Sequence, residues 1–598
     1  MRTLRALSTA SFAAALALLI ALPGSGCSAP AARSPDEATA KAPPPPAPTP
    51  AAPSASLIPQ GSAQAPAPAA PAAPTKHKFA VATENATASA IAMDVLARGG
   101  SAVDAAIAGA LAIGVVHPVS SGLGGGGFAT VYDAKTKEIR ILDFRETAPK
   151  DLVPTELAKR PVPEEQRGVM TGVPGEVAGI AEMHARWGKL AMADLVRGAA
   201  DTAEKGFPVS AHMVRALKWN EKWLLAAPRY GLFAKAGAIV PVGETVKNPA
   251  LAATLRRIGA EGKKAFYEGS IAADILATAR AGKCRMTKKD LEDYKVLDRE
   301  PLRTQWEGYE VVTMPPPSAG GVMMLETLHM HSKADLAALG HNTGAYTHLL
   351  AETMRGAVAD RVRLLGDPRF VKMDVAKIVS PERMKARRAK ISMTSTTKAE
   401  NFPVNDAGTT HIVTVDAEGN VASITTTVNN MFGAQLVTEG GFLLNDELAD
   451  FTAERVEKLF GMSKGPNYPK GGARPTSSMT PTIVTKDGKP VLALGGSGGT
   501  RIATGTTQVL LSHLVFGMPV DKAVAAPRFE TPPTGGLFID AAIGTEVLQD
   551  LEKRGEVVDT SKPNFSAVQA VSIQEGPDGA RVLSVGADPR KGGVGLVQ

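Results

Sequence analysis

Apolar positions follow a helical spacing in several stretches of the first two thirds of the chain. Ser101-Ala102-Val103-Asp104 precedes an Ala-rich run and has the composition of a capping box, and Gly99-Gly100 would end the helix before it. Residues 176–187 and 346–365 are long helical stretches. The segments 128–132 and 139–144 instead indicate two strands joined by a charged turn. We therefore expect helices to begin the globular part of the chain, followed by a hairpin.

The final third has the pattern of antiparallel strands. Three hairpins are predicted, each with a turn that contains glycine, and several of their strands are almost continuously apolar or β-branched. Such strands are typical of sheets covered on both faces, so we expect stacked sheets with outer helices. The predicted strand pairs are 410–415 with 421–428, 482–484 with 491–494, and 567–573 with 581–585, and their turns are Glu418-Gly419-Asn420, Asp487-Gly488 and Asp578-Gly579.

The N-terminal segment has the pattern of an export signal. Arg2 and Arg5 precede the apolar run 12–22, which is short for a membrane span. The small residues before Cys27 resemble a bacterial lipoprotein cleavage box, although Gly24 stands where an aliphatic residue is usual. We expect residues 1–27 to be a lipoprotein-type signal and Cys27 to carry lipid, which implies an exported, periplasmic or membrane-anchored protein of a bacterium. The alternative is an ordinary signal peptide with a chance cysteine.

Residues 28–76 consist mostly of proline and alanine and include Pro43-Pro44-Pro45-Pro46. This composition cannot form a packed core and favours extended conformations. We predict a disordered tether, and from about residue 77 one compact unit without a further linker or internal repeat.

The composition narrows the possible partners and chemistry. The 598 residues are 44% hydrophobic and 21% charged, and the 66 basic against 59 acidic residues form no basic block, so nucleic acid is not implied as a partner. Cys27 and Cys284 are the only cysteines, which excludes a disulfide framework in the mature chain. Because no His-bearing motif accompanies Cys284, we interpret it as a structural thiol rather than a nucleophile.

One segment carries candidate chemistry, since Gly408 precedes Thr409 at the head of a predicted strand. A threonine hydroxyl is a poor nucleophile. It becomes useful when the preceding peptide bond is cut, because the new α-amine, with a pKa near ~8, can take the hydroxyl proton. Taken alone, Thr-Thr-His in a strand usually indicates only a strand.

The segment 408–416, with Gly419-Asn420 and Asn429, resembles the autoprocessing site of the γ-glutamyltransferase family (γ-glutamyltranspeptidase, glutathione hydrolase), whose members are N-terminal-nucleophile hydrolases. Further blocks follow in the family's order along almost the whole chain after Lys78. They are Gly99-Gly100-Ser101-Ala102-Val103-Asp104-Ala105-Ala106, Ser120-Ser121-Gly122-Leu123-Gly124-Gly125-Gly126-Gly127-Phe128, Asp143-Phe144-Arg145-Glu146-Thr147-Ala148-Pro149, Gly172-Val173-Pro174-Gly175, Pro315-Pro316-Pro317-Ser318-Ala319-Gly320-Gly321, Leu365-Gly366-Asp367-Pro368, Arg474-Pro475-Thr476-Ser477-Ser478-Met479 and Ala525-Ala526-Pro527-Arg528-Phe529.

The resemblance implies an α+β fold, a four-layer αββα sandwich built from both products of self-cleavage. Residues 77–408 would be the large subunit and residues 409–598 the small one. The implied reaction transfers the γ-glutamyl group of glutathione and similar amides to water, an amino acid or a peptide. No metal or organic cofactor is implied. The partner subunits would form a heterodimer, and contact with a membrane would come only through the lipid.

The resemblance also assigns the reacting groups. Thr409 is the expected nucleophile, and the Thr427 hydroxyl would hydrogen-bond the Thr409 hydroxyl. Strand alternation would place Thr425 and Asn429 on the same face as Thr427, with Asn429 at the amino-acid end of the substrate.

Recognition of an α-amino acid needs groups for both of its charges. Arg145 would pair with the α-carboxylate, and Ser477 and Ser478 would donate hydrogen bonds to it. Glu447 and Asp450 are three residues apart, so they can share one side of a helical turn and hold the α-ammonium group.

A glycine-rich turn, residues 495–501, follows the strand 491–494 and precedes a helical stretch. Backbone N–H groups at such a turn can stabilise negative charge, and Gly498 and Gly499 match the family's oxyanion glycines. The lysine of a phosphate loop is absent from this turn and from the glycine-rich run 121–127. We interpret the run 121–127 as a segment whose glycines allow tight packing.

One departure concerns the loop that closes the pocket. Phe460 stands where several members have a tyrosine, and the loop to Tyr468 is short. The resemblance therefore implies that the hydroxyl contact of the closing tyrosine is lost in this chain.

Two alternatives stay open: a cephalosporin acylase-like enzyme that cleaves glutaryl amides, and an unprocessed, inactive binding module. Glutaryl groups lack the α-ammonium, so Glu447 and Asp450 argue against the first. The intact Thr409, Thr427 and glycines argue against the second.

Overall fold

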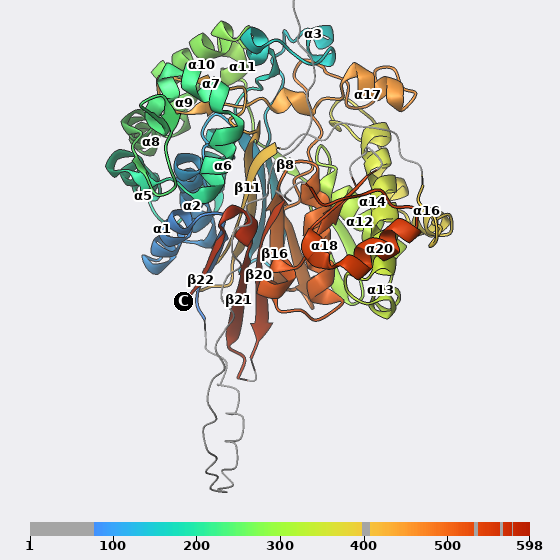
Figure 1. Ribbon diagram of the computed structural model, residues 1–598. Helices are drawn as coiled ribbons and strands as arrows, with labels where there is room; N and C mark the ends of the chain where they lie inside the picture. Colours follow the sequence, from blue (N-terminus) through green and yellow to red (C-terminus); the bar gives the residue numbers. More distant parts are fainter. Residues whose placement is uncertain (1–76, 398–406, 532–535, 562–565, 577) are drawn as a thin grey trace, which may run out of the picture. The chain divides into compact units, whose positions relative to one another are not determined.

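The computed structural model describes residues 77–397, 407–531, 536–561, 566–576 and 578–598 (Figure 1). The predicted signal, the predicted lipid attachment at Cys27 and the predicted tether lie outside these residues. None of the helices in the described part of the chain is long and apolar enough to cross a membrane.

Within the described residues, seven strands form an antiparallel sheet in the order β22-β1-β11-β12-β2-β3-β8. The sheet joins strands from both sides of the bond 408–409. The strands are β22 (Val594–Val597), β1 (Ala80–Thr83), β11 (Ala407–Val415), β12 (Val421–Asn430), β2 (Gly126–Asp133), β3 (Glu138–Phe144) and β8 (Leu297–Arg299).

A second sheet of six described strands is also antiparallel, in the order β21-β20-β16-β15-β10-β9. It too combines strands from both expected subunits. The strands are β21 (Arg581–Ala587), β20 (Ala567–Glu575), β16 (Lys489–Ser497), β15 (Thr482–Lys486), β10 (Tyr309–Thr313) and β9 (Leu302–Trp306).

The two sheets pack face to face, and helices cover both outer faces (Figure 1). Helices α1 (Ala86–Ala97), α2 (Ala102–Val116) and α4 (Glu176–Trp187) lie against the seven-stranded sheet. Helices α12 (Gly320–Met330) and α18 (Arg501–Leu514) cover the six-stranded sheet. The predicted four-layer αββα sandwich is confirmed.

Further helices pack around these layers. Those that share one hydrophobic core with α1 and α2 are α5 (Met192–Lys205), α6 (Ala211–Trp219), α7 (Glu221–Ala226), α8 (Pro249–Glu261), α9 (Lys263–Tyr267), α10 (Ser270–Ala281) and α11 (Lys288–Glu292). The remaining α-helices are α3 (Pro154–Ala158), α13 (Lys333–Leu339), α14 (Gly344–Leu364), α15 (Val375–Ile378), α16 (Pro381–Arg388), α17 (Glu454–Leu459), α19 (Val520–Ala525) and α20 (Thr545–Lys553).

The strand β11 shows why its sequence is continuously apolar. Ile412 packs in the core formed with α2, whereas Val413 and Val415 pack between the two sheets. Each side chain is fully buried because the strand has a layer on either face. The local predictions hold as well: all four hairpins form, and the Ser101 and Asp104 side chains each accept the other's backbone N–H.

Cys284 is buried, and burial raises the pKa of its thiol to about 11. The thiol therefore stays protonated near neutral pH, which agrees with a structural role.

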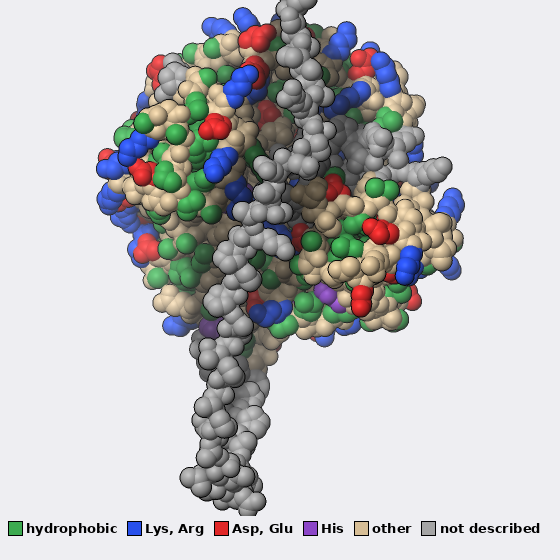
Figure 2. Space-filling model, in the orientation of Figure 1, with side chains coloured by type: hydrophobic (Ala, Val, Ile, Leu, Met, Phe, Trp, Pro, Cys, Tyr) green, Lys and Arg blue, Asp and Glu red, His purple; other side chains and the backbone are tan. Residues whose placement is uncertain are grey.

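On the face seen in Figure 2, basic and acidic side chains are interspersed.

Candidate active site

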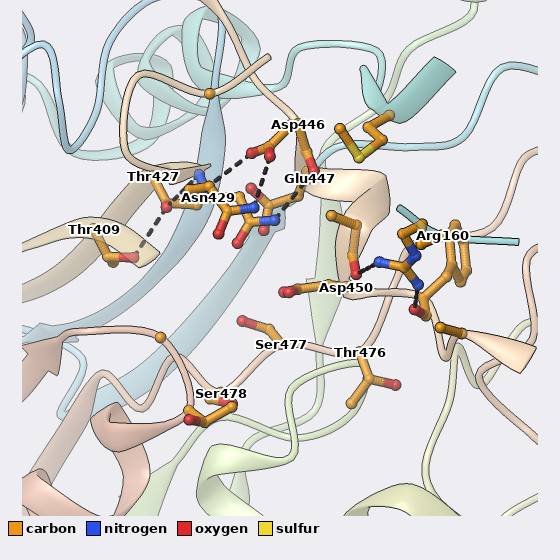
Figure 3. Close-up of a pocket in the computed structure, with 18 of the residues that line it drawn as sticks. Arg160, Thr409, Thr427, Asn429, Asp446, Glu447, Asp450, Thr476, Ser477 and Ser478 are labelled. Atoms are coloured by element: carbon orange, nitrogen blue, oxygen red, sulfur yellow. Dashed lines mark hydrogen bonds between the residues drawn. The ribbon is translucent and has the colours of Figure 1, made fainter. Parts of the chain in front are cut away.

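Thr409 lies at the head of β11, where the pairing with β12 changes register. Gly408 pairs with Asn429 and Thr409 pairs with Thr427, so Val428 is an extra residue on β12. Asn429 has a φ of +73°, which is unusual outside glycine. This bulge brings the hydroxyl oxygens of Thr409 and Thr427 to 3.0 Å from each other (Figure 3).

The carbonyl oxygen of Gly408 lies within hydrogen-bonding distance of both hydroxyl groups, at 2.7 Å from Thr409 Oγ and 2.6 Å from Thr427 Oγ. The Asn429 N–H donates to Thr427 Oγ over 2.8 Å. Thr427 accepts this bond with a lone pair, which leaves its single proton free to donate to the Gly408 carbonyl. The peptide bond before Thr409 is thus polarised beside a hydroxyl nucleophile.

Gly408 lies too close to the neighbouring backbone for any side chain. A Cβ atom at this position would be 2.1 Å from the carbonyl oxygen of Val119 and 3.1 Å from the Cα of Ser120. Both contacts are backbone atoms, which cannot rotate away. Glycine is therefore required for the observed arrangement of the bond 408–409.

We predict that Gly408→Ala slows cleavage of this bond strongly, because the methyl group displaces the carbonyl that Thr427 polarises. A time course of freshly purified protein on a denaturing gel measures the rate. Gly231→Ala is the matched control, since a Cβ at Gly231 meets no atom within 4 Å. Cleavage of Gly408→Ala at the rate of the control would show that the close approach has no part in the reaction.

Thr409 and Thr427 lie at the wall of a cavity of about 730 Å³ (Figure 3). This volume is in the range of small-molecule sites. Nearly all predicted substrate-contacting residues line it, although they come from distant parts of the chain. Among the lining residues are Arg145, Thr409, Thr427, Asn429, Asp446, Glu447, Asp450, Ser477, Ser478 and Gly499.

The predicted charged clamp forms one ion-pair cluster in this cavity. The fully buried guanidinium of Arg145 donates to Glu447 and, over 2.6 Å, to Asp450, and its Nε donates to the Pro475 carbonyl. Burial alone would lower the pKa of Arg145, but the two carboxylates outweigh it and raise that pKa. An α-amino acid would bring one charge of each sign, so its binding can replace these internal pairs charge for charge.

Ser477, Ser478 and Asn429 also line the cavity. The Asn429 side-chain amide donates to the Asp446 carbonyl over 3.1 Å, and Ser477 Oγ accepts the Met479 N–H. In the view of Figure 3, Asp450 lies between Asp446 and the two serines. Polar groups thus surround the space next to Thr409.

The predicted oxyanion glycines form the turn between β16 and α18. Gly498 has a φ of +117° and Gly499 a φ of +63°, conformations that glycine adopts without strain. Gly499 lines the cavity. The turn places these backbone groups at the N-terminus of α18, where a negative charge is favoured.

Thr425 does not line the cavity. Its hydroxyl lies 2.8 Å from His411 Nδ1 and its side chain is fully buried between the sheets. Burial lowers the pKa of His411 to about 3, so this imidazole stays neutral. Thr425 therefore supports the strand from inside the core.

Phe460 is not among the residues that line the cavity either. It follows α17 and packs with Val362 and Val456, and the Arg363 guanidinium lies 5.2 Å from its ring centre. Tyr468 likewise stays out of the lining and lies under Lys464. In this conformation neither aromatic ring closes the cavity.

Two further residues of the site, Arg160 and Asp446, were not predicted from the sequence. Arg160, in the loop after α3, reaches the cavity and donates to the carbonyls of Ala449 and Phe451 (Figure 3). Asp446 accepts from the backbone N–H and the side-chain amide of Asn430, and burial raises its pKa to about 6. Asp446 could have been predicted, because it is the neighbour of Glu447. Arg160 lies in an irregular loop, where no sequence pattern indicates a role in the site.

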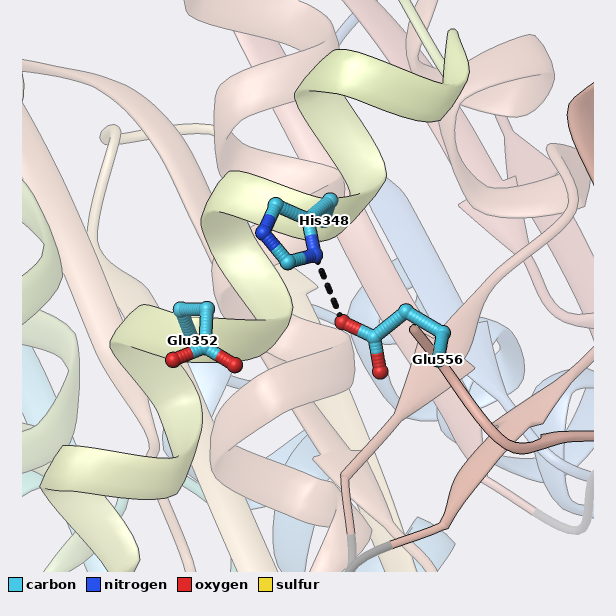
Figure 4. A group of neighbouring side chains, drawn as sticks. All are labelled: His348, Glu352 and Glu556. Carbon is cyan, nitrogen blue, oxygen red and sulfur yellow. Dashed lines mark hydrogen bonds and ion pairs between the residues drawn. The ribbon is translucent and has the colours of Figure 1, made fainter. Parts of the chain in front are cut away.

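Among the described residues, His348, Glu352 and Glu556 have the spacing of metal ligands (Figure 4). Both imidazole nitrogens are already bonded, to Glu556 and to the Ser392 carbonyl. The guanidinium of Arg355 binds both carboxylates. Because this cation already pairs with both carboxylates, we interpret the cluster as a structural ion-pair network.

A threonine at the head of an inner strand of an αββα sandwich, preceded by a polarised peptide bond, defines the class of N-terminal-nucleophile hydrolases. The sequence model of the family described as Gamma-glutamyltranspeptidase matches residues 88–597. The chain belongs to this family.

Curated relatives and solved structures agree with this assignment. The glutathione hydrolase proenzyme of Pseudomonas aeruginosa is 37% identical over 535 residues, which cover 87% of this chain and 94% of that protein. The glutathione hydrolase proenzyme of Bacillus subtilis (strain 168) is 35% identical over 520 residues, which cover 82% of this chain and 87% of that protein. A cephalosporin acylase from Bacillus halodurans superimposes with a TM-score of 0.77 at 25% identity, covering 89% of this chain and 98% of that one. The γ-glutamyltranspeptidase of Helicobacter pylori has a TM-score of 0.50 at 34% identity over 52% of this chain and 91% of that one.

Proposed function

We propose that this chain is a proenzyme that cuts its own bond between Gly408 and Thr409 and then acts as a γ-glutamyltransferase and glutathione hydrolase. Its products would be a large subunit ending at Gly408 and a small subunit of residues 409–598, held together as a heterodimer. The observation that carries the proposal is the contact of both Thr409 and Thr427 with the Gly408 carbonyl at the wall of a charged cavity.

In the cleavage step, Thr409 Oγ attacks the Gly408 carbonyl carbon. The C–N bond breaks, the Thr409 nitrogen takes the proton that the hydroxyl loses, and an ester joins Gly408 to the Thr409 side-chain oxygen. Water hydrolyses this ester and leaves a free carboxylate and a free α-amine. Thr427 supports the step, because its hydroxyl donates to the Gly408 carbonyl oxygen, where negative charge develops.

In the transfer step, the α-amine of Thr409 takes the hydroxyl proton while Oγ attacks the γ-carbonyl of the donor. Gly498 and Gly499 would stabilise the developing oxyanion. The leaving amine receives the proton, and a γ-glutamyl ester remains on Thr409. Water, or the amine of an amino acid or peptide, then takes the γ-glutamyl group from the ester.

For substrate selection, we assign the α-carboxylate to Arg145, Ser477 and Ser478 and the α-ammonium to Glu447 and Asp450, with Asn429 beside them. The cephalosporin acylase shares the fold, but the clamp favours a donor with an α-ammonium group. A glutaryl amide would leave a carboxylate of the clamp without a positive partner.

Parallel assays with γ-glutamyl-p-nitroanilide and glutaryl-p-nitroanilide test this assignment. The purified, processed protein is expected to release nitroaniline from the γ-glutamyl compound at least ~10-fold faster, since one charge-assisted hydrogen bond contributes roughly 1.5–3 kcal/mol. Faster hydrolysis of the glutaryl compound would replace the proposed function by an acylase activity.

We also propose that Cys27 carries lipid and that the enzyme is exported and tethered to a membrane through residues 28–76. The small residues before Cys27 support this. Cells grown with a labelled fatty acid are expected to label the wild-type protein and not Cys27→Ala. Equal labelling of both, or of neither, would refute the anchor.

A further inference from the structure

The ammonium group of Lys591 links the two parts of the proposed acyl-transfer site. It donates to the carbonyl oxygen of Thr409 over 3.0 Å and to Ser497 Oγ over 2.7 Å. Thr409 is the proposed nucleophile, and Ser497 directly precedes the proposed oxyanion glycines. One buried side chain therefore contacts both elements whose relative position determines the reaction geometry.

The sheet topology explains how a residue so near the C-terminus reaches this place. Lys591 ends a short 3-10 helix, Pro589–Lys591, just before β22. β22 pairs with β1, with Val594 opposite Thr83, and β1 in turn pairs with β11. Lys591 thus lies just before β22, Glu84 just after β1 and Thr409 at the head of β11, all at the same end of three adjacent strands. Ser497 is the last residue of β16 in the facing sheet.

Glu84 is the counter-ion of this lysine. Its Oε2 lies 3.6 Å from the Lys591 ammonium, and its Oε1 accepts the proton of Ser497 Oγ. All three side chains are almost completely buried. Burial lowers the pKa of Lys591, with Glu84 opposing the shift, and burial raises the pKa of Glu84, with Lys591 opposing it.

The other ionisable groups around Lys591 are either ion-paired with other residues or neutral. Asp588 is paired with Arg528 and Arg590, and Arg501 is paired with Glu530. The nearby histidines His117 and His212 have their pKa values lowered by burial, so both imidazoles are neutral near pH 7.

We propose that Lys591 is a positioning residue, which fixes the Thr409 backbone to the oxyanion turn and whose positive charge favours the neutral, basic form of the Thr409 α-amine after cleavage. The inference rests on the proposed function. It extends that function, because it says that Lys591 controls the protonation state of the Thr409 α-amine, the catalytic base. Lys591 does this without contact with the substrate or the reacting atoms.

Two physical effects support the role. Hydrogen bonds to a backbone carbonyl and to Ser497 restrain both elements, and small displacements of reacting groups are costly in rate. A cation held on the carbonyl of Thr409 also repels a second positive charge on the nitrogen of the same residue. The α-amine therefore loses its proton at a lower pH than it would without Lys591.

The test compares wild type with the double variant Lys591→Met and Glu84→Gln, which removes the pair without leaving one buried charge alone. After mass spectrometry confirms cleavage, kcat, KM and the pH profile of kcat/KM are measured with γ-glutamyl-p-nitroanilide. We expect kcat to fall about 10- to 100-fold, KM to stay unchanged, and the acidic limb of the profile to move to higher pH.

Ser497→Ala is the second variant, because it removes one link and keeps both charges. It is expected to lower kcat without moving the acidic limb, and it keeps the test decisive if the double variant does not cleave itself. Lys522→Met is the control, since Lys522 is exposed on α19.

A wild-type kcat in Ser497→Ala, or a cleaved double variant with unchanged kcat and pH profile, would overturn the role of Lys591. These outcomes leave the proposed function intact as long as the wild type hydrolyses the substrate. Absence of activity in the processed wild type would instead refute the proposed function itself.

Discussion

Thr409→Ala is expected to remain a single chain and to hydrolyse no γ-glutamyl-p-nitroanilide. The same hydroxyl attacks the Gly408 carbonyl in the precursor and the γ-carbonyl of the donor in the mature enzyme, so its removal abolishes both steps. Denaturing gels and a nitroaniline release assay measure the two effects on one preparation.

Thr409→Ser is the matched control, because the hydroxyl survives and only the methyl group is lost. It is expected to cleave itself and to retain part of the activity. Thr410→Ala tests the neighbouring position, where the hydroxyl belongs to a fully buried side chain in the core of the sheet. If Thr409→Ala is cut at this bond in pure form, the self-cleavage mechanism is wrong.

Replacement of the charged clamp gives the second large effect. Asp450→Asn is nearly isosteric and is expected to raise the KM for γ-glutamyl donors by about 10- to 100-fold, because a charge-assisted bond is worth roughly 1.5–3 kcal/mol. Arg145→Ala is expected to raise KM at least as much. Cleavage of the bond 408–409 is expected to persist in both, since neither side chain contacts Gly408 among the described hydrogen bonds.

Arg145 is fully buried, so its loss also leaves Glu447 without its partner, and the melting temperature of each variant has to be measured alongside. Arg140→Ala is the control, because Arg140 forms an exposed ion pair with Glu138 outside the cavity. Kinetics identical to wild type in both Asp450→Asn and Arg145→Ala would assign the substrate's charges to other residues.

Local patterns predicted much of this fold. The hairpins β11–β12, β15–β16 and β20–β21 follow from alternating or continuous apolar segments with glycine turns, and the capping box at Ser101 from four adjacent residues. These features depend on neighbours in the sequence, so a single sequence contains the necessary information. The family motifs then located the reacting and charged residues at the cavity wall, such as Thr409, Arg145 and Asp450.

The remaining features depend on long-range geometry. Strand alternation predicted that Thr425 lines the cavity together with Thr427. The cavity reaches only the head of β11, whereas Thr425 lies further along the strand pair, opposite His411. The bulge at Val428 is invisible to a two-residue period. Lys591 and Thr409 are 182 positions apart in the sequence. Their contact follows only from the strand order, in which β22, β1 and β11 are neighbours.

Intact-mass spectrometry of the purified wild-type protein tests the central claim most directly. The account predicts two chains, one of which has the mass of residues 409–598 with an unmodified threonine at its N-terminus. A single uncut chain that still hydrolyses γ-glutamyl-p-nitroanilide, or an internal cut within residues 77–598 at a bond other than 408–409, would contradict it.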